Sequence, residues 1–84
     1  MATRDTYKYR LKDGNRIVYI GTTNDLERRE REHRTEGMDF TKIEKVGNIT
    51  TGDAAGAWEA EAIKRYKQQH GNERPKYNKN DSGK

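Results

Sequence analysis

The chain has 84 residues, which is enough for one small domain and too few for two separate hydrophobic cores. Charged residues make up 38% and hydrophobic residues only 29%, but 18 basic against 14 acidic side chains leave a net charge of just +4, so we expect a folded domain with a thin core. The sequence has no cysteine, only two histidines and no long apolar run, which excludes disulfide frameworks, zinc–thiolate sites and membrane spans.

The domain is expected over residues 6–78, between disordered ends at residues 1–5 and 79–84. Its first segment, residues 6–12, alternates strictly and predicts a β-strand with two unlike faces. One face is aromatic and apolar and the other is basic: Tyr7, Tyr9 and Leu11 lie on the first, and Lys8, Arg10 and Lys12 on the second.

A hairpin is expected next, because Asp13-Gly14 is a strong turn signal between two strand-like runs. Residues 16–21 form the second run, which is β-branched and continuously apolar, and we expect it to be buried on both faces.

The first helix is expected over residues 24–36, with Asn24 as its N-cap and Gly37 as its stop. Leu26 is its only apolar residue up to that stop. The stripe that contains Leu26 continues through Arg29 and His33, so the inward face of this helix is predicted to be cationic and titratable.

A third strand over residues 40–49 and a second helix over residues 54–68 complete an α+β fold of order β-β-α-β-α. We expect a small, mostly antiparallel three-stranded sheet flanked by the helices. Helix geometry places Glu59 within the apolar stripe and Glu61 toward solvent. A carboxylate on a buried face is costly unless it is paired or binds a cation, so Glu59 has two readings: a structural ion pair with Arg29, or a ligand for a hard divalent cation.

The order of these elements resembles the GIY-YIG nuclease domain family over residues 7–78. One similar member of this family is the N-terminal domain of the bacterial excision-repair nuclease. Tyr9 and Tyr19 are ten residues apart, Tyr19 and Arg29 are ten apart, and Arg29 and His33 are four apart. The matching segments follow in order: Tyr19-Ile20-Gly21, Arg29, His33, Glu59 with Ile63-Lys64, and Pro75-Lys76-Tyr77-Asn78.

The resemblance implies an endonuclease that hydrolyses phosphodiester bonds with one divalent metal ion, Mg²⁺ or Mn²⁺. It implies that Glu59 binds the metal, that Arg29 contacts the scissile phosphate and that Tyr9 and Tyr19 are the motif tyrosines. His33 matches a histidine of some members, and Gly21 and Asn78 match supporting positions. Either a tyrosine or His33 is the general base, and the sequence leaves that choice open.

The first motif departs from the family because Tyr7-Lys8-Tyr9 lacks the glycine, and Tyr7 is an alternative to Tyr9 there. The stretch from Glu59 to Asn78 is also longer than in the excision-repair member of the family, and the extra residues fall in the loop over residues 69–74. A nucleic-acid-binding module of the same fold without efficient catalysis is therefore a second reading, and a basic module that binds a protein is a third. Singly, the motif tyrosines also fit ordinary core aromatics, and Arg29 with His33 also fits an exposed helix face.

Binding is expected to rely on phosphate contacts from basic side chains near the two chain ends, which we expect to converge near the site. The candidates are Lys8, Arg10, Lys12 and Arg16 in the hairpin and Arg74, Lys76 and Lys79 near the end. The isoelectric point, near 9.4, also favours a polyanionic partner. With the family resemblance we expect DNA rather than RNA, although the sequence itself does not distinguish the two. Sequence specificity would need a partner protein or an oligomer. The first twelve residues lack the apolar core of a signal peptide, so we expect a cytoplasmic or otherwise intracellular protein with no membrane partner.

Overall fold

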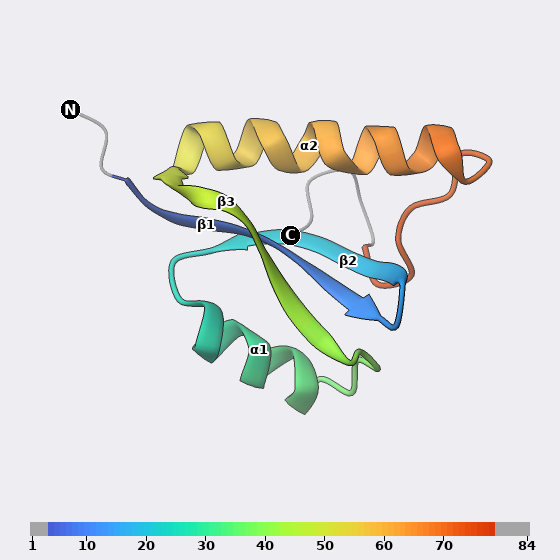
Figure 1. The fold of residues 1–84 in the computed structure, drawn as a ribbon, viewed down its shortest axis with the longest axis horizontal. Helices are drawn as coiled ribbons and strands as arrows, with labels where there is room; N and C mark the ends of the chain where they lie inside the picture. The colour runs from blue at the N-terminus through green and yellow to red at the C-terminus, as the bar shows by residue number, and fades with distance from the viewer. Residues whose placement is uncertain (1–3, 79–84) are drawn as a thin grey trace.

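A computed structural model describes residues 4–78 and confirms the expected fold class, a three-stranded antiparallel sheet with two helices (Figure 1). The elements in chain order are β1 (Arg4–Asp13), β2 (Arg16–Thr23), α1 (Leu26–Thr35), β3 (Lys42–Thr51) and α2 (Gly52–Gln69). In Figure 1 the helices lie on opposite sides of the sheet, with α2 along one side and α1 against the other. Neither of these helices is long and apolar enough to cross a bilayer.

Several element boundaries differ from the prediction. β1 begins at Arg4, because Arg4 and Thr6 pair with Thr51 and Thr50 of β3, so residues 4 and 5 of the predicted disordered end belong to the sheet. The remaining predicted ends, residues 1–3 and 79–84, lie outside the described residues. β3 starts two residues later than predicted, and α2 starts two residues earlier, capped by the Thr51 hydroxyl, which accepts from Ala54 N at 3.1 Å.

The central strand is β1, since the strand order is β2-β1-β3. A strand in that position seldom carries three cations on one face, and here the neighbouring strand compensates two of them. Glu44 of β3 faces Arg10 in the register and forms an ion pair with its guanidinium, and Lys12 Nζ lies 3.7 Å from Glu44 Oε2. Hydrogen bonding from Arg10 also lowers the pKa of the Glu44 carboxyl.

The outer edge of β2 is covered by the last segment of the described chain. Tyr77 N donates to Val18 O at 2.8 Å. The Asn78 side chain accepts from Ile20 N at 2.9 Å and donates to Ile20 O at 3.0 Å. This segment therefore satisfies backbone groups that an uncovered edge strand would expose.

Helix α1 begins at Leu26, two residues after the predicted start, with Asp25 rather than Asn24 as its N-cap. Asp25 Oδ1 accepts from Arg28 N at 3.1 Å, and the Thr23 hydroxyl accepts from Asp25 N at 3.1 Å, which holds the capping residue in place. The predicted stop at Gly37 is confirmed: its φ of +86° is the left-handed conformation that closes helices, and its amide donates to Arg34 O.

Each face of the sheet carries its own buried cluster. On the α2 side, Ile20 packs with Ile63 and Tyr66. On the α1 side, the cluster is centred on β1: its buried members are Tyr9, Leu11, Val18 and Phe40, and Tyr19, Leu26, Met38, Ile43 and Tyr77 pack around them.

Candidate active site

The strand register brings the two predicted motif tyrosines to the same face of the sheet. Tyr9 of β1 pairs with Gly21 of β2, and Leu11 pairs with Tyr19, so the tyrosines lie two pair positions apart. Their ring centroids are 6.0 Å apart with an interplanar angle of 27°. Tyr9 is only 1% exposed, whereas Tyr19 is partly exposed at the border of the cluster.

Helix α1 supplies a buried histidine to these tyrosines. His33 is 3% exposed, and its Nε2 lies 2.8 Å from the Tyr9 hydroxyl oxygen. The His33 ring centroid is also 4.8 Å from that of Tyr19. The predicted inward stripe on this helix is therefore confirmed, and its deepest member is an imidazole.

Gly21 makes the close approach of these rings sterically feasible. A Cβ atom at this position would lie 2.6 Å from Tyr19 Cε1 and 2.8 Å from the Tyr9 hydroxyl oxygen. Real Cβ atoms are essentially never that close to other heavy atoms. The glycine of the Tyr19-Ile20-Gly21 segment is thus required by packing.

Burial sets the protonation states of the three rings. It raises the pKa of Tyr9 far above its ordinary value, and burial followed by the charge of Glu59 raises the pKa of Tyr19. Burial lowers the pKa of His33, although Glu36 works in the opposite direction. Tyr9 is therefore a neutral phenol hydrogen-bonded to Nε2 of a neutral His33, and the other imidazole nitrogen, Nδ1, lies 3.4 Å from Glu36 Oε1.

Glu59 brings a buried carboxylate from α2. It is 3% exposed, and its charge contributes to the raised pKa values of both Tyr9 and Tyr19. Glu61, two residues further along, is exposed. The prediction that Glu59 and not Glu61 lies on the inward face of the helix is confirmed.

Arg29 lies at the edge of the same cluster. Its positive charge lowers the pKa values of Tyr9, Tyr19 and His33, which places it within electrostatic reach of all three. The side chain is 38% exposed, and Nη1 lies 3.5 Å from Glu32 Oε1. Its Nε is buried and has no hydrogen-bond partner within residues 4–78. A half-exposed guanidinium with an unsatisfied donor is well suited to an anion.

Two of the predicted supporting residues have different surroundings. Asn78 grips both backbone polar groups of Ile20, directly between Tyr19 and Gly21, and is 7% exposed. Tyr7 is partly buried and lines a separate hollow at the start of α1, with Leu26 and Lys45. Of the two candidates for the first-motif tyrosine, Tyr9 is therefore the one beside Tyr19 and His33.

The basic residues proposed for phosphate contact are scattered. Strand alternation puts Lys8, Arg10 and Lys12 on the face of β1 opposite Tyr9, and α2 covers that face, so this part of the expected convergence on the site was wrong. The other described candidates, Arg16, Arg74 and Lys76, are exposed. Lys79 lies outside the described residues.

One neighbour of the site was missed in the sequence. Glu36 contacts His33 from the last turn of α1, at the i,i+3 spacing that brings side chains together on a helix. That spacing is visible in the sequence, but its significance depends on His33 being buried, which the helix alone does not establish.

The donor set is limited to one buried carboxylate. Within residues 4–78 no three histidine, aspartate or glutamate side chains gather to hold a metal ion. Magnesium often binds through one or two carboxylates, completing its shell with water and substrate phosphates, so Glu59 is compatible with such an ion. No protein family, no curated protein and no solved structure matches this chain.

Proposed function

We propose that this protein is a metal-dependent endonuclease that hydrolyses phosphodiester bonds in nucleic acid, DNA in particular. The observation that carries the proposal is the convergence of Tyr9, Tyr19 and His33, with Arg29 and Glu59 in electrostatic reach of both phenols. A cluster of buried polar side chains in so small a protein costs stability and favours a functional role.

Arg29 is proposed to hold the scissile phosphate. Its unsatisfied Nε and half-exposed guanidinium offer donors to the non-bridging oxygens, where negative charge develops during hydrolysis. A lysine could not reproduce the planar fork of donors, so the role is specific to arginine.

Tyr9 and His33 are proposed to remove the proton of the attacking water. Tyr9 alone is a poor base, because its pKa is strongly raised. Its hydroxyl is hydrogen-bonded to Nε2 of a neutral imidazole, so with the imidazole proton on Nδ1 the phenol can pass its proton to His33 as it accepts one from water. Tyr19 is the second phenol in contact with this imidazole.

Glu59 is proposed to bind the divalent cation, Mg²⁺ or Mn²⁺. When bound, such an ion supplies Lewis-acid stabilisation of the phosphoryl and leaving oxygens. The same charge would offset the cost of burying the Glu59 carboxylate, which is 3% exposed.

The test is metal-dependent cleavage of supercoiled plasmid and of branched DNA, measured with Mg²⁺, with Mn²⁺ and with chelator. We expect cleavage by the wild type only with metal, loss of cleavage to background in Glu59→Gln, and retained cleavage in the matched variant Glu61→Gln. Equal loss in both variants would show that Glu59 is the wrong choice of metal-binding carboxylate. Cleavage that persists in Glu59→Gln would refute the metal site.

A second candidate is a nucleic-acid-binding module of the same fold that does not cut. The altered first motif, Tyr7-Lys8-Tyr9, favours it, because this segment lacks the family's glycine. Equal DNA binding by the wild type and Glu59→Gln, with no cleavage by either, would select this candidate. Absence of any salt-dependent binding to DNA or RNA would refute both and favour a protein partner.

A further inference from the structure

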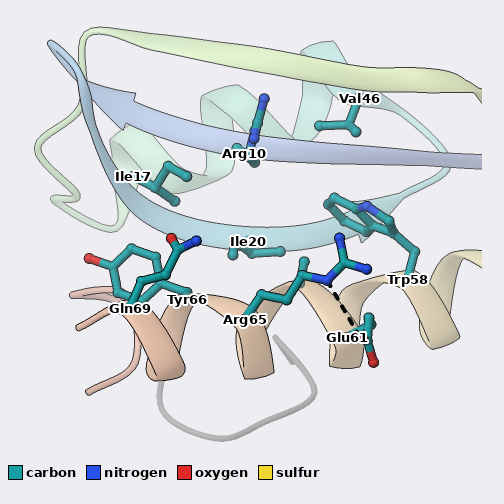
Figure 2. Close-up of a pocket in the computed structure, with 10 residues that line it drawn as sticks. Arg10, Ile17, Ile20, Val46, Trp58, Glu61, Arg65, Tyr66 and Gln69 are labelled. Atoms are coloured by element: carbon teal, nitrogen blue, oxygen red, sulfur yellow. Dashed lines mark ion pairs between the residues drawn. The ribbon is translucent and has the colours of Figure 1, made fainter. Parts of the chain in front are cut away.

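A second hollow, with a volume of about 350 Å³, lies on the opposite face of the sheet between α2 and the strands. Figure 2 shows it with Trp58 and Arg65 on α2 and with Ile20 and Arg10 on the strands. We propose that this groove binds one unpaired base of a single-stranded nucleic acid, stacked on Trp58, with the adjoining phosphate held by Arg65. The proposal rests on the proposed function for its class of ligand.

Trp58 supplies the stacking surface. The indole is partly buried, packs beside Ile20 and Ile63, and lines the hollow. The Lys8 ammonium lies 5.9 Å from the ring centroid, a cation–π contact that places positive charge beside the same ring. An aromatic platform beside a cation is how proteins bind single strands without selecting a sequence, since every base has a stackable face.

Arg65 supplies a cation that is available to a ligand. It lies two turns after Trp58 on the same side of α2, and its side chain is 74% exposed. Its ion pair in the protein is with Glu61, with Nε and Oε1 3.5 Å apart and both side chains exposed (Figure 2). Such an exposed pair is weak, so exchanging Glu61 for a phosphate has little cost.

Arg10 gives the groove a polar donor on the strand side. Glu44 fixes its guanidinium, yet Arg10 Nε is buried without a hydrogen-bond partner in the described part of the chain. A carbonyl or ring nitrogen of a base is the kind of acceptor that satisfies this donor. Ligand pockets run from roughly 300 to 1,000 Å³, so this hollow fits a single planar ring better than an extended peptide.

The position of the groove relates it to the candidate active site. Three of its lining residues are immediate chain neighbours of site residues: Arg10 follows Tyr9, Ile20 follows Tyr19, and Trp58 precedes Glu59. The two sites therefore draw on the same three segments. Because the two sites lie on opposite faces of the sheet, a single strand whose phosphate lies at Arg29 would have to run around an edge of the sheet to place a flanking base on Trp58.

Fluorescence tests the proposal directly, because Trp58 is the only tryptophan in the chain. The full chain is titrated in chelator, where a metal-dependent enzyme does not cut, with a short single-stranded oligonucleotide, the matching duplex and inorganic polyphosphate. We expect saturable quenching by the single strand alone. No quenching, or equal quenching by the duplex or by polyphosphate, would overturn the assignment of an unpaired base.

Matched variants locate the effect. Arg65→Ala should weaken single-strand affinity about tenfold and reduce its salt dependence, whereas Lys64→Ala, an exposed neighbour outside the groove, should bind as the wild type does. Equal losses in both variants would refute the groove. Thermal unfolding checks that both remain folded.

The outcomes separate this proposal from the proposed function. Quenching that is retained by Glu59→Gln in a protein that never cuts would support the groove and refute the nuclease. Metal-dependent cleavage without any change in Trp58 fluorescence would do the reverse.

Discussion

On the α2 side of the sheet, Ile20 packs against Ile63 and Tyr66, and two of the three cations on that side of β1, Arg10 and Lys12, are paired with Glu44. On the α1 side, the equivalent space beside Tyr9 holds a second phenol and an imidazole. One face thus resembles an ordinary small core, and the other is a core in which hydrogen-bonding groups occupy apolar positions. The buried hydrogen-bonding groups of the α1 face cost stability, and the proposed function gives that cost a reason, whereas α2 combines an apolar stripe with the single buried carboxylate of Glu59.

The same contrast extends to how the two helices are attached. α2 buries Ala55, Ile63 and Tyr66 as well as the Glu59 carboxylate. The only buried residue of α1 is His33, and Leu26 is its only partly buried apolar residue. On the α1 face, residues proposed for catalysis therefore also pack the helix against the sheet. Mutations there should change both activity and stability, unless the side chain lies at the exposed edge of the cluster.

Arg29 lies at this exposed edge and should give the largest separation between chemistry and stability. Arg29→Ala is expected to lower the cleavage rate by roughly 10²–10³-fold, as loss of a donor to developing charge does, with little change in melting temperature. Plasmid-nicking rates and thermal unfolding measure the two effects, and Arg31→Ala on the exposed side of α1 is the control. Near wild-type cutting by Arg29→Ala would remove this residue from the mechanism.

Gly21 should give the next largest effect, this time on stability. Gly21→Ala forces a methyl group against Tyr19 and Tyr9 and is expected to cost about 3 kcal/mol of unfolding free energy. Gly56→Ala on α2 meets nothing within 4 Å and should instead stabilise by about 0.5–1 kcal/mol, because it lies in a helix interior. Urea denaturation compares the pair; equal effects would mean that the rings of the α1 face are not closely packed.

Substitutions of Tyr9 and Tyr7 test whether the buried polar groups of the α1 face depend on hydrogen bonds to one another. Tyr9→Phe leaves His33 Nε2 without its hydrogen-bond partner and should cost about 1–2 kcal/mol as well as cleavage activity. Tyr7→Phe should change the unfolding free energy by less than about 0.5 kcal/mol. Denaturation and nicking assays on both proteins decide the first-motif tyrosine, and a loss confined to Tyr7→Phe would reverse the assignment.

The smallest expected effect is a pH dependence that comes from His33 on the α1 face. Burial lowers the pKa of His33 in the folded protein. The positive charge of Arg29 also lowers it, whereas the negative charges of Glu36 and Glu32 raise it. The unfolded chain therefore takes up a proton near pH 6.5 that the folded chain resists, so stability is lost as the pH falls below about 6.5. Melting temperatures between about pH 7.5 and 5.5 should fall for the wild type and flatten for His33→Gln. A similar slope in both proteins would contradict a buried neutral imidazole.

Much of the fold followed from local patterns in the sequence. The alternation around Tyr9, the Asp13-Gly14 turn and the stop at Gly37 predicted elements that the structure confirms. Ends were less accurate: β1 starts at Arg4, because its partner is a distant segment of β3 whose pairing leaves no local trace. The cap at Asp25 rather than Asn24 likewise depends on Thr23 holding its amide.

For the candidate site, the sequence by itself determined which face of its own element each residue occupies, because the periods of strand and helix are fixed by backbone geometry. The sequence therefore placed His33 and Glu59 on inward faces and put Lys8 on the other face of β1 from Tyr9. Only the tertiary structure decided which faces meet: Tyr9 opposite Gly21, His33 on Tyr9, and Asn78 across the backbone of Ile20. Register and helix docking depend on packing between segments far apart in the chain, which no local period encodes.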